Sequence, residues 1–132
     1  MKGLNNLPYR KGVGIMLLNK ETKVFIGKRI DSTKAWQMPQ GGVDQKEDVE
    51  SAAKRELKEE TGITSIEIIK KSEKEFIYDL PNELLGKIWD GKYKGQKQTW
   101  FLAKFLGEHD EINIKQKKAE FYDWRWSEPL EL

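Results

Sequence analysis

The chain of 132 residues has no cysteine and only one histidine. Without cysteine there is no disulfide framework, no thiolate zinc site and no cysteine nucleophile, and the composition fits a reducing compartment. Apolar runs such as residues 15–18 fall far short of the roughly 18–20 residues of a membrane-spanning helix. The first six residues carry one charge and no apolar segment, so no signal peptide is predicted. We therefore expect a cytoplasmic protein with no membrane partner.

The charge balance is close to neutral, with 24 Lys and Arg against 22 Asp and Glu and a net charge of +2. Such a balance predicts no strong general attraction to a long nucleic acid, and we expect no DNA partner. Only four of the basic residues are arginines, which mark positions where a planar, bidentate donor is useful. The length suits a single domain spanning residues 1–132, which we expect to be a monomer.

Alternating and continuous apolar patterns predict strands on both sides of one central helix. A hairpin is expected over residues 12–18 and 24–28, and the later strands are expected over residues 65–69, 74–80, 99–106 and 121–126. Strong helix formers predict a helix over residues 48–61, with Gly62 ending it. Together these elements predict a mixed α/β fold.

Two segments between these elements attract attention. Pro39 and the pair Gly41 and Gly42 are expected to interrupt regular structure. Residues 81–95 form a long polar connection, and connections of that length within a compact domain are often functional. We therefore expect the long connection to have a functional role.

The predicted helix carries three glutamates, Glu56, Glu59 and Glu60, on the same side as its apolar residues. Desolvating several carboxylates together is costly, and a divalent cation would remove the conflict. Carboxylate oxygens at this spacing suit Mg²⁺, or Mn²⁺ in its place, which would share its remaining positions with substrate phosphates. Taken alone, the glutamates are better explained as a solvated helix surface, as acidic clusters usually are.

A wider spacing decides between these interpretations. Gly41 is followed after five residues by Glu47, and after seven more by the sequence RELKEETGI at residues 55–63. This pattern resembles the 23-residue box of the Nudix hydrolases. The resemblance implies the Nudix fold, a mixed β-sheet sandwiched between helices in the α/β class. It also implies metal-dependent hydrolysis of a nucleoside diphosphate linked to a further group.

The resemblance also implies roles for individual residues of the box. Glu56, Glu59 and Glu60 are expected to bind metal, and one of them to position or deprotonate the attacking water. Glu47 and Arg55 resemble the pair that fixes the loop to the helix. The remaining positions are glycines: Gly41 and Gly42, whose backbone comes close to phosphate and, at Gly41, to the metal, and Gly62 at the end of the helix.

The flanks of the box resemble the bacterial RNA pyrophosphohydrolase branch, which includes similar dinucleoside tetraphosphate hydrolases. The matching stretches are YRKGVG at 9–14, WQMPQGG at 36–42, GQKQTWF at 95–101 and EFYDWRW at 120–126. The branch removes pyrophosphate from 5′-triphosphorylated RNA and leaves a 5′-monophosphate, which initiates mRNA decay. The expected partner is therefore 5′-triphosphate RNA or, alternatively, a dinucleoside polyphosphate of the Ap4A type.

The same resemblance assigns residues outside the box. Arg10, Arg29, Tyr78 and Gln40 are expected to bind substrate, and Glu120 to be an additional metal ligand. Other interpretations stay open at this stage: the arginines and Glu120 could be solvated, and Tyr78 could belong to the core.

Two further hypotheses follow from the pattern as a whole. A non-catalytic nucleotide sensor on the same fold is disfavoured because all the metal-binding carboxylates are present. The chain ends shortly after Trp126, whereas members of the branch continue into a C-terminal helix, so we expect either that the sequence is truncated or that the protein lacks this helix.

Overall fold

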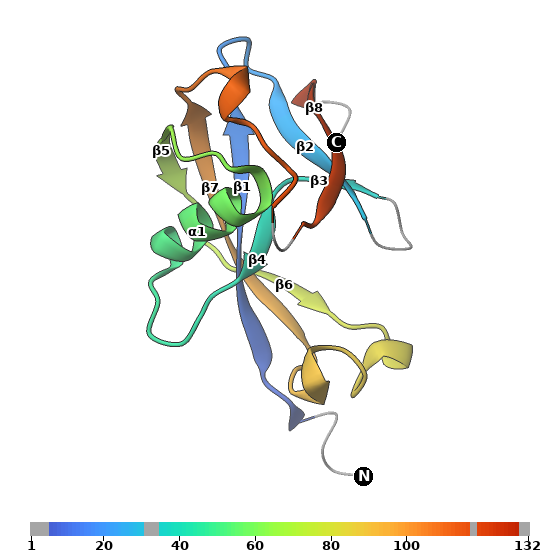
Figure 1. The fold of residues 1–132 in the computed structure, drawn as a ribbon. Helices are drawn as coiled ribbons and strands as arrows, with labels where there is room; N and C mark the ends of the chain where they lie inside the picture. The colour runs from blue at the N-terminus through green and yellow to red at the C-terminus, as the bar shows by residue number, and fades with distance from the viewer. Residues whose placement is uncertain (1–5, 31–34, 117–118, 130–132) are drawn as a thin grey trace.

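The computed structural model describes residues 6–30, 35–116 and 119–129. Within these ranges, one α-helix and eight strands make up most of the fold (Figure 1). In chain order they are β1 (Tyr9–Leu18), β2 (Val24–Arg29), β3 (Trp36–Gln37), β4 (Gln40–Gly42), α1 (Val49–Thr61), β5 (Ile66–Lys71), β6 (Phe76–Asp79), β7 (Gly95–Phe105) and β8 (Phe121–Ser127). None of the helices in the described ranges has the length and apolar character to span a membrane.

The strands form one mixed sheet in the order β3-β2-β1-β7-β5. β4 pairs with β1, β6 with β7 and β8 with β2. β1 and β7 run parallel over their whole length, while the other pairings are antiparallel. The predicted mixed α/β fold is thus confirmed, and so is the hairpin of β1 and β2, in which Leu18 pairs with Val24. Within the described ranges α1 is the one α-helix.

Local signals explain where α1 begins and ends. The side chain of Asp48 accepts a hydrogen bond of 2.8 Å from the backbone N–H of Ser51, which caps the first turn. Gly62 ends the helix in the left-handed region at φ 76°, and its N–H donates to the carbonyl of Lys58. The sequence therefore predicted this element to within one residue.

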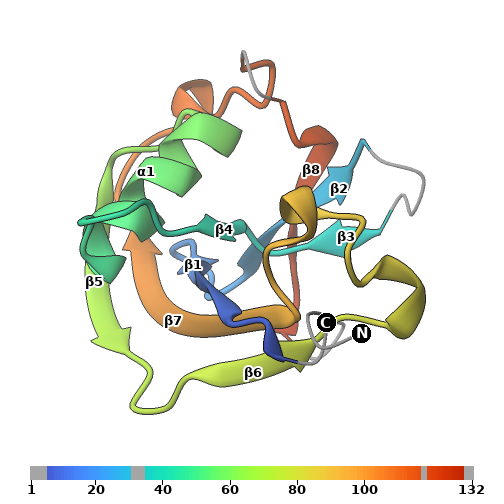
Figure 2. The same cartoon turned by 90° about the horizontal axis from the view of Figure 1, so that it is seen from below.

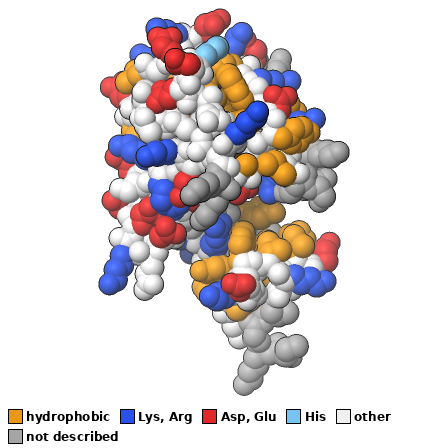
Figure 3. Space-filling view, in the orientation of Figure 1, with side chains coloured by type: hydrophobic (Ala, Val, Ile, Leu, Met, Phe, Trp, Pro, Cys, Tyr) orange, Lys and Arg blue, Asp and Glu red, His pale blue; other side chains and the backbone are white. Residues whose placement is uncertain are grey.

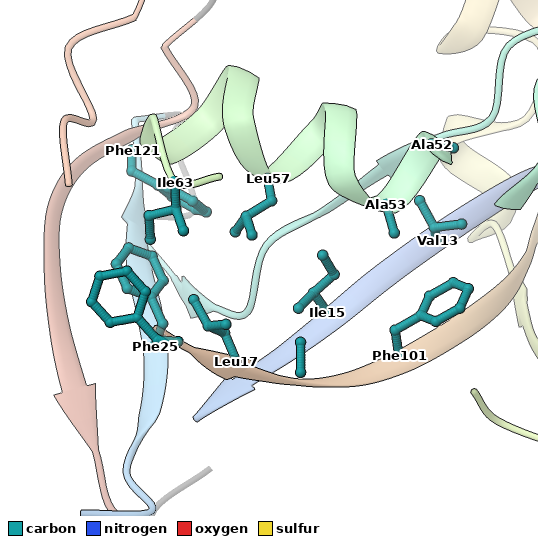
Figure 4. Packing of buried hydrophobic residues seen from close by; sticks show 12 residues of the cluster. Val13, Ile15, Leu17, Phe25, Ala52, Ala53, Leu57, Ile63, Phe101 and Phe121 are labelled. Carbon is teal, nitrogen blue, oxygen red and sulfur yellow. The ribbon is translucent and has the colours of Figure 1, made fainter. Parts of the chain in front are cut away.

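The core lies between α1 and the sheet. Ala52, Ala53 and Leu57 of the helix are buried against alternate residues of the central strands (Figure 4). Those strand residues are Val13, Ile15 and Leu17 of β1 and Phe101 and Ala103 of β7. This packing fixes the side of α1 that faces the sheet, and hence the direction of its glutamates.

The expectation for residues 39–42 was wrong in part. Gly41 and Gly42 do not interrupt regular structure but belong to β4, where they pair with Val13 and Gly12 of β1. Figure 2 shows β4 running beneath α1 and beside β1. The pairing partner supplied by β1 outweighs the weak intrinsic strand preference of glycine.

β7 and the connection before it also differ from the prediction. The strand begins at Gly95 rather than at residue 99, because its polar first residues pair with β1 and β6. The connection from 81 to 94 contains two short 3₁₀ helices, η2 (Asn82–Leu84) and η3 (Trp89–Gly91). The connection is therefore ordered into turns that lead into the first residue of β7.

Candidate active site

The two glycines of β4 make room for charged side chains. A Cβ added to Gly41 would lie 2.1 Å from Cδ of Glu56, which reaches across from α1. A Cβ added to Gly42 would lie 2.2 Å from Nη2 of Arg10, which comes from β1. The glycine pair therefore allows the carboxylate of Glu56 and the guanidinium of Arg10 to pack directly against the backbone of β4.

Glu60 is the most unusual of the acidic residues because it is only 2% exposed. The backbone N–H of Gln40 donates to its carboxyl group, but the second oxygen, Oε2, is buried with no hydrogen-bond partner. Burial, followed by the nearby charges of Glu56 and Glu120, raises the pKa of Glu60 to about 9. The interpretation of the glutamates as a solvated helix surface is therefore wrong for Glu60.

The other two helix glutamates are less deeply placed. Burial also raises the pKa of Glu56, although hydrogen bonding to Arg55 acts in the opposite direction. The side chain of Glu59 is 41% exposed. The face thus runs from a buried carboxyl at Glu60 to a half-exposed one at Glu59.

Arg55 joins the loop before α1 to this acidic face. Its Nε and Nη2 donate to the two carboxylate oxygens of Glu47 at 2.8 and 3.0 Å, and Nη2 also donates to the carbonyl of Gly42 at 2.9 Å. Its Nη1 donates to Glu56 at 3.0 Å and to Glu59 at 3.2 Å. The guanidinium holds the pKa of Glu47 down at about 2. The expected pairing of Glu47 with Arg55 is present.

Two adjoining cavities expose these groups. One of about 280 Å³ is lined by residues from β1, β2, β4 and α1 and by Glu120. The other, of about 250 Å³, shares Glu56, Glu60 and Glu120 with the first. The larger one gathers eight of the residues expected at the site: Arg10, Arg29, Gln40, Gly41, Gly42, Glu56, Glu60 and Glu120. Glu59 and Arg55 line the smaller one.

The acidic groups fit a divalent cation by their chemistry. Within the described ranges, no three acidic or histidine side chains are already gathered closely enough to hold a metal ion. Arg55 engages Glu56 and Glu59 instead. However, hard carboxylate oxygens are the donors that Mg²⁺ and Mn²⁺ prefer, and the unpaired Oε2 of Glu60 is a buried acceptor without a donor.

The predicted substrate residues differ in where they lie. Arg29 donates from Nη1 to Oε1 of Gln37 at 3.0 Å, so a neighbouring side chain orients it at the cavity. Tyr78 does not line the cavity; it lies in β6 and is 53% exposed, so it is not a core residue. It pairs with Gln96 of β7, and opposed residues of an antiparallel pair project to the same face. Gln96 itself lines the larger cavity.

The sequence did not predict Trp89. It lies in η3, lines the larger cavity, and has its ring centre 5.0 Å from Cζ of Arg10. Trp89 and Asp90 adopt left-handed backbone conformations with φ of 52° and 56°, an unfavourable arrangement for such residues that is often found at functional sites. The length of the connection was the available signal, but it does not indicate which residue points inward.

Comparisons with known proteins show which family and which solved structures this chain resembles. The NUDIX domain family matches residues 8–132. An RNA pyrophosphohydrolase of Pelagibacter ubique is 57% identical over 122 residues, which cover 92% of this chain and 77% of the relative. The RNA pyrophosphohydrolase of Sphingopyxis alaskensis is 54% identical over 125 residues, 92% of this chain and 79% of the relative.

Solved structures share the fold. A binary complex of Ap4A hydrolase from C. elegans superposes with a TM-score of 0.68 at 26% identity, covering 90% of this chain and 80% of the other. The dihydroneopterin triphosphate pyrophosphohydrolase of E. coli superposes with a TM-score of 0.72 at 21% identity, covering 91% and 82%. At that identity the second likeness concerns the fold alone.

Proposed function

Because the chain belongs to the Nudix family, within its RNA pyrophosphohydrolase branch, we propose that it is an RNA 5′-pyrophosphohydrolase. It removes pyrophosphate from 5′-triphosphorylated RNA and leaves a 5′-monophosphate, the step that initiates mRNA decay. The observation that carries the proposal is the larger cavity, where the buried carboxyl of Glu60 lies with Arg10 and Arg29. Such a cavity offers acceptors for a cation and donors for a chain of phosphates.

Nudix hydrolases use divalent metal ions. We propose Mg²⁺ for this chain, with Mn²⁺ able to substitute. The ligands would be Glu56, Glu59, Glu60 and Glu120, together with the backbone at Gly41. When bound, the metal would activate water and neutralise charge on the transferred and leaving phosphates.

The remaining residues bind and orient the substrate. Arg10 and Arg29 offer bidentate donors to phosphate oxygens, and Gln40 lies beside them in the same cavity. Gly41 and Gly42 leave the backbone of β4 open to close approach. One of the helix glutamates positions or deprotonates the attacking water. Tyr78 stays a predicted phosphate contact, since it shares a face with Gln96 but lies outside the cavity lining.

A second candidate is hydrolysis of dinucleoside polyphosphates. The likeness to an Ap4A hydrolase from C. elegans favours it, and the same cavity would accept either polyphosphate. The RNA substrate is preferred because the relatives at 57% and 54% identity carry that name. We further propose that the chain acts as a single-domain monomer in the cytoplasm.

A comparison of kcat/KM on the two kinds of substrate distinguishes the two candidate functions. We expect kcat/KM in Mg²⁺ to be about a hundredfold higher, or about 2.7 kcal/mol in transition-state binding, on a short 5′-triphosphate RNA than on diadenosine tetraphosphate. The Glu59→Gln variant is the matched control and should be inactive on both while remaining folded. A preference for the dinucleotide would overturn the RNA proposal.

A further inference from the structure

The face of the sheet that α1 covers continues beyond the helix and changes character there. Val13 and Ile15 of β1 are buried, and strand alternation places Lys11 and Tyr9 on the same face. On β7, Lys97 pairs with Lys11 in the parallel register and lies on the face of the buried Phe101. In Figure 1 these ends of β1 and β7 extend below α1. The apolar face therefore becomes aromatic and basic where the helix no longer covers it.

Tyr9 is the centre of this exposed region. The Nζ atoms of Lys94 and Lys97 lie 4.8 and 5.5 Å from the centre of its ring. Its hydroxyl donates a short hydrogen bond to Oδ1 of Asp79. The ring is thus held in place by β6 and has two ammonium groups close to it.

This region is continuous with the candidate active site. A cavity of about 720 Å³ is lined by Tyr9, Lys11 and Tyr93, and it shares Arg10 and Glu56 with the cavity of about 280 Å³ described above. A substrate held at Arg10 therefore lies at the border of both cavities.

The connection between β6 and β7 adds aromatic side chains along the same path. Tyr93 lies edge-on to Trp89 with ring centres 6.1 Å apart, and Trp89 in turn covers Arg10. Backbone hydrogen bonds of Lys94 with Leu80 and Pro8 fasten the end of the connection to its surroundings. Figure 3 shows hydrophobic and basic side chains beside one another on this lower part of the molecule.

The carboxylates nearest to this region are already engaged. Asp44 and Glu47 face Arg55 at 3.6 and 2.8 Å, and Asp79 accepts the hydroxyl of Tyr9. Arg10, Lys46 and Arg55 add to Lys11, Lys94 and Lys97, so the basic groups here outnumber these three carboxylates and Glu56, although the net charge of the chain is only +2.

We propose that the surface formed by Tyr9, Lys11, Tyr93, Lys94 and Lys97, here called the basic aromatic surface, binds the single-stranded RNA that follows the 5′ nucleotide. Unpaired nucleotides are bound by stacking of bases on aromatic rings and by lysines on the backbone phosphates. A dinucleoside polyphosphate has no such strand, so the surface selects RNA. This inference rests on the proposed function and adds a second contact region to it.

The test compares two 5′-triphosphate RNAs, of two and of twelve nucleotides, as substrates of the full chain. The wild type should have a kcat/KM at least tenfold higher on the longer RNA. The double variant Lys94→Ala with Lys97→Ala should lose most of that advantage and keep its activity on the shorter RNA. Because each lost phosphate contact on a single strand lowers the salt slope by about 0.7, the slope for the longer RNA should fall by about 1.4.

Two further variants make the result specific. Lys104→Ala removes an exposed lysine at the opposite end of β7 and should leave kcat/KM on both RNAs unchanged. Tyr93→Leu keeps an apolar side chain but removes a stacking ring, and it should raise KM on the longer RNA alone. Thermal unfolding of each variant shows whether it remains folded.

Two outcomes would overturn the basic aromatic surface while leaving the chemistry intact. One is equal kcat/KM of the wild type on both RNAs, and the other is equal losses by the double variant on both. A different outcome contradicts the proposed function itself, namely turnover of diadenosine tetraphosphate with no turnover of either RNA.

Discussion

The carboxyl group of Glu56 fills the space into which a side chain on Gly41 would project, with only 2.1 Å between an added Cβ and Cδ of Glu56. The guanidinium of Arg10 likewise fills the space into which a side chain on Gly42 would project. These glycines belong to a paired strand, so their lack of a side chain serves packing of charged groups rather than an unusual backbone angle. The position of the Glu56 carboxylate thus depends on a residue that has no side chain.

Replacing Gly41 tests this dependence. The Gly41→Ala change should displace Glu56, lower kcat/KM on triphosphate RNA by about a hundredfold, and destabilise the fold by about 1–3 kcal/mol through overpacking. Gly107→Ala is a matched control, because its Cβ would also meet a carboxylate, that of Glu111, away from the cavities. Full activity of Gly41→Ala would contradict the assigned role of Glu56.

Glu60 should make the stability of the metal-free protein depend on pH. Its folded pKa of about 9 lies above its ordinary value of 4.5, so the folded state keeps a proton that the unfolded chain loses. The resulting stabilisation is complete below about pH 4.5 and is lost as pH rises toward 9, by up to about 1.4 kcal/mol per pH unit. Urea unfolding in EDTA between pH 5 and 9 measures this loss.

The Glu60→Gln variant is expected to remove that loss, since its side chain cannot ionise. Glu67→Gln, at an exposed position of β5, should leave the pH profile of the wild type unchanged. Saturating Mg²⁺ should flatten the profile of the wild type but not that of Glu60→Gln. Identical profiles of the wild type and Glu60→Gln in EDTA would show that Glu60 is ionised without a cation.

Arg55 should stabilise the fold by holding the loop before α1 to the helix. The Arg55→Ala change removes the guanidinium donors to Glu47 and to the carbonyl of Gly42 and leaves Glu47 only the backbone N–H of Asp44, so we expect a loss of about 2–4 kcal/mol in the free energy of unfolding. Arg55→Lys should recover only part of it, because an ammonium cannot reproduce the forked contacts. Denaturant unfolding of both variants and of Glu47→Gln in a double-mutant cycle gives the coupling energy. A coupling near zero would contradict the role of the pair in holding the loop.

Trp89 should affect substrate binding more than turnover. The Trp89→Ala change removes the ring that covers Arg10, and loss of about 1 kcal/mol should raise KM for triphosphate RNA roughly fivefold with kcat nearly unchanged. Trp89→Phe should recover most of the loss. Trp36→Ala is the control. The ring of Trp36 covers Arg125 in a similar way, but Trp36 does not line the 280 Å³ cavity that contains Trp89. An equal effect of both alanine variants would count against a specific role of Trp89.

Much of the fold followed from local signals. α1 was predictable because Asp48 and Gly62 mark its ends and its alanines and leucine share one side. The Nudix box identified the acidic face, and the structure brings Glu120 beside Glu56 and Glu60 although it is distant in the sequence. That juxtaposition came from resemblance and not from any local pattern.

Other features depend on tertiary contacts that no local pattern contains. β4 is a strand because β1 lies beside it, which overrides the glycines of its own sequence. The burial of Glu60 beneath Gln40, and the place of Trp89 over Arg10, likewise require elements from distant parts of the chain to meet. Sequence reasoning could mark the connection from 81 to 94 as important but could not place its tryptophan.

The most direct test of the account follows the phosphates of the 5′ end. A short triphosphate RNA labelled at its α and γ phosphates is incubated with the chain, with and without Mg²⁺, beside the Glu59→Gln variant. We predict RNA with a 5′-monophosphate together with labelled pyrophosphate, formed only with a divalent metal and at least about a thousandfold more slowly by Glu59→Gln. Unchanged triphosphate RNA, or equal rates for the wild type and Glu59→Gln, would contradict it.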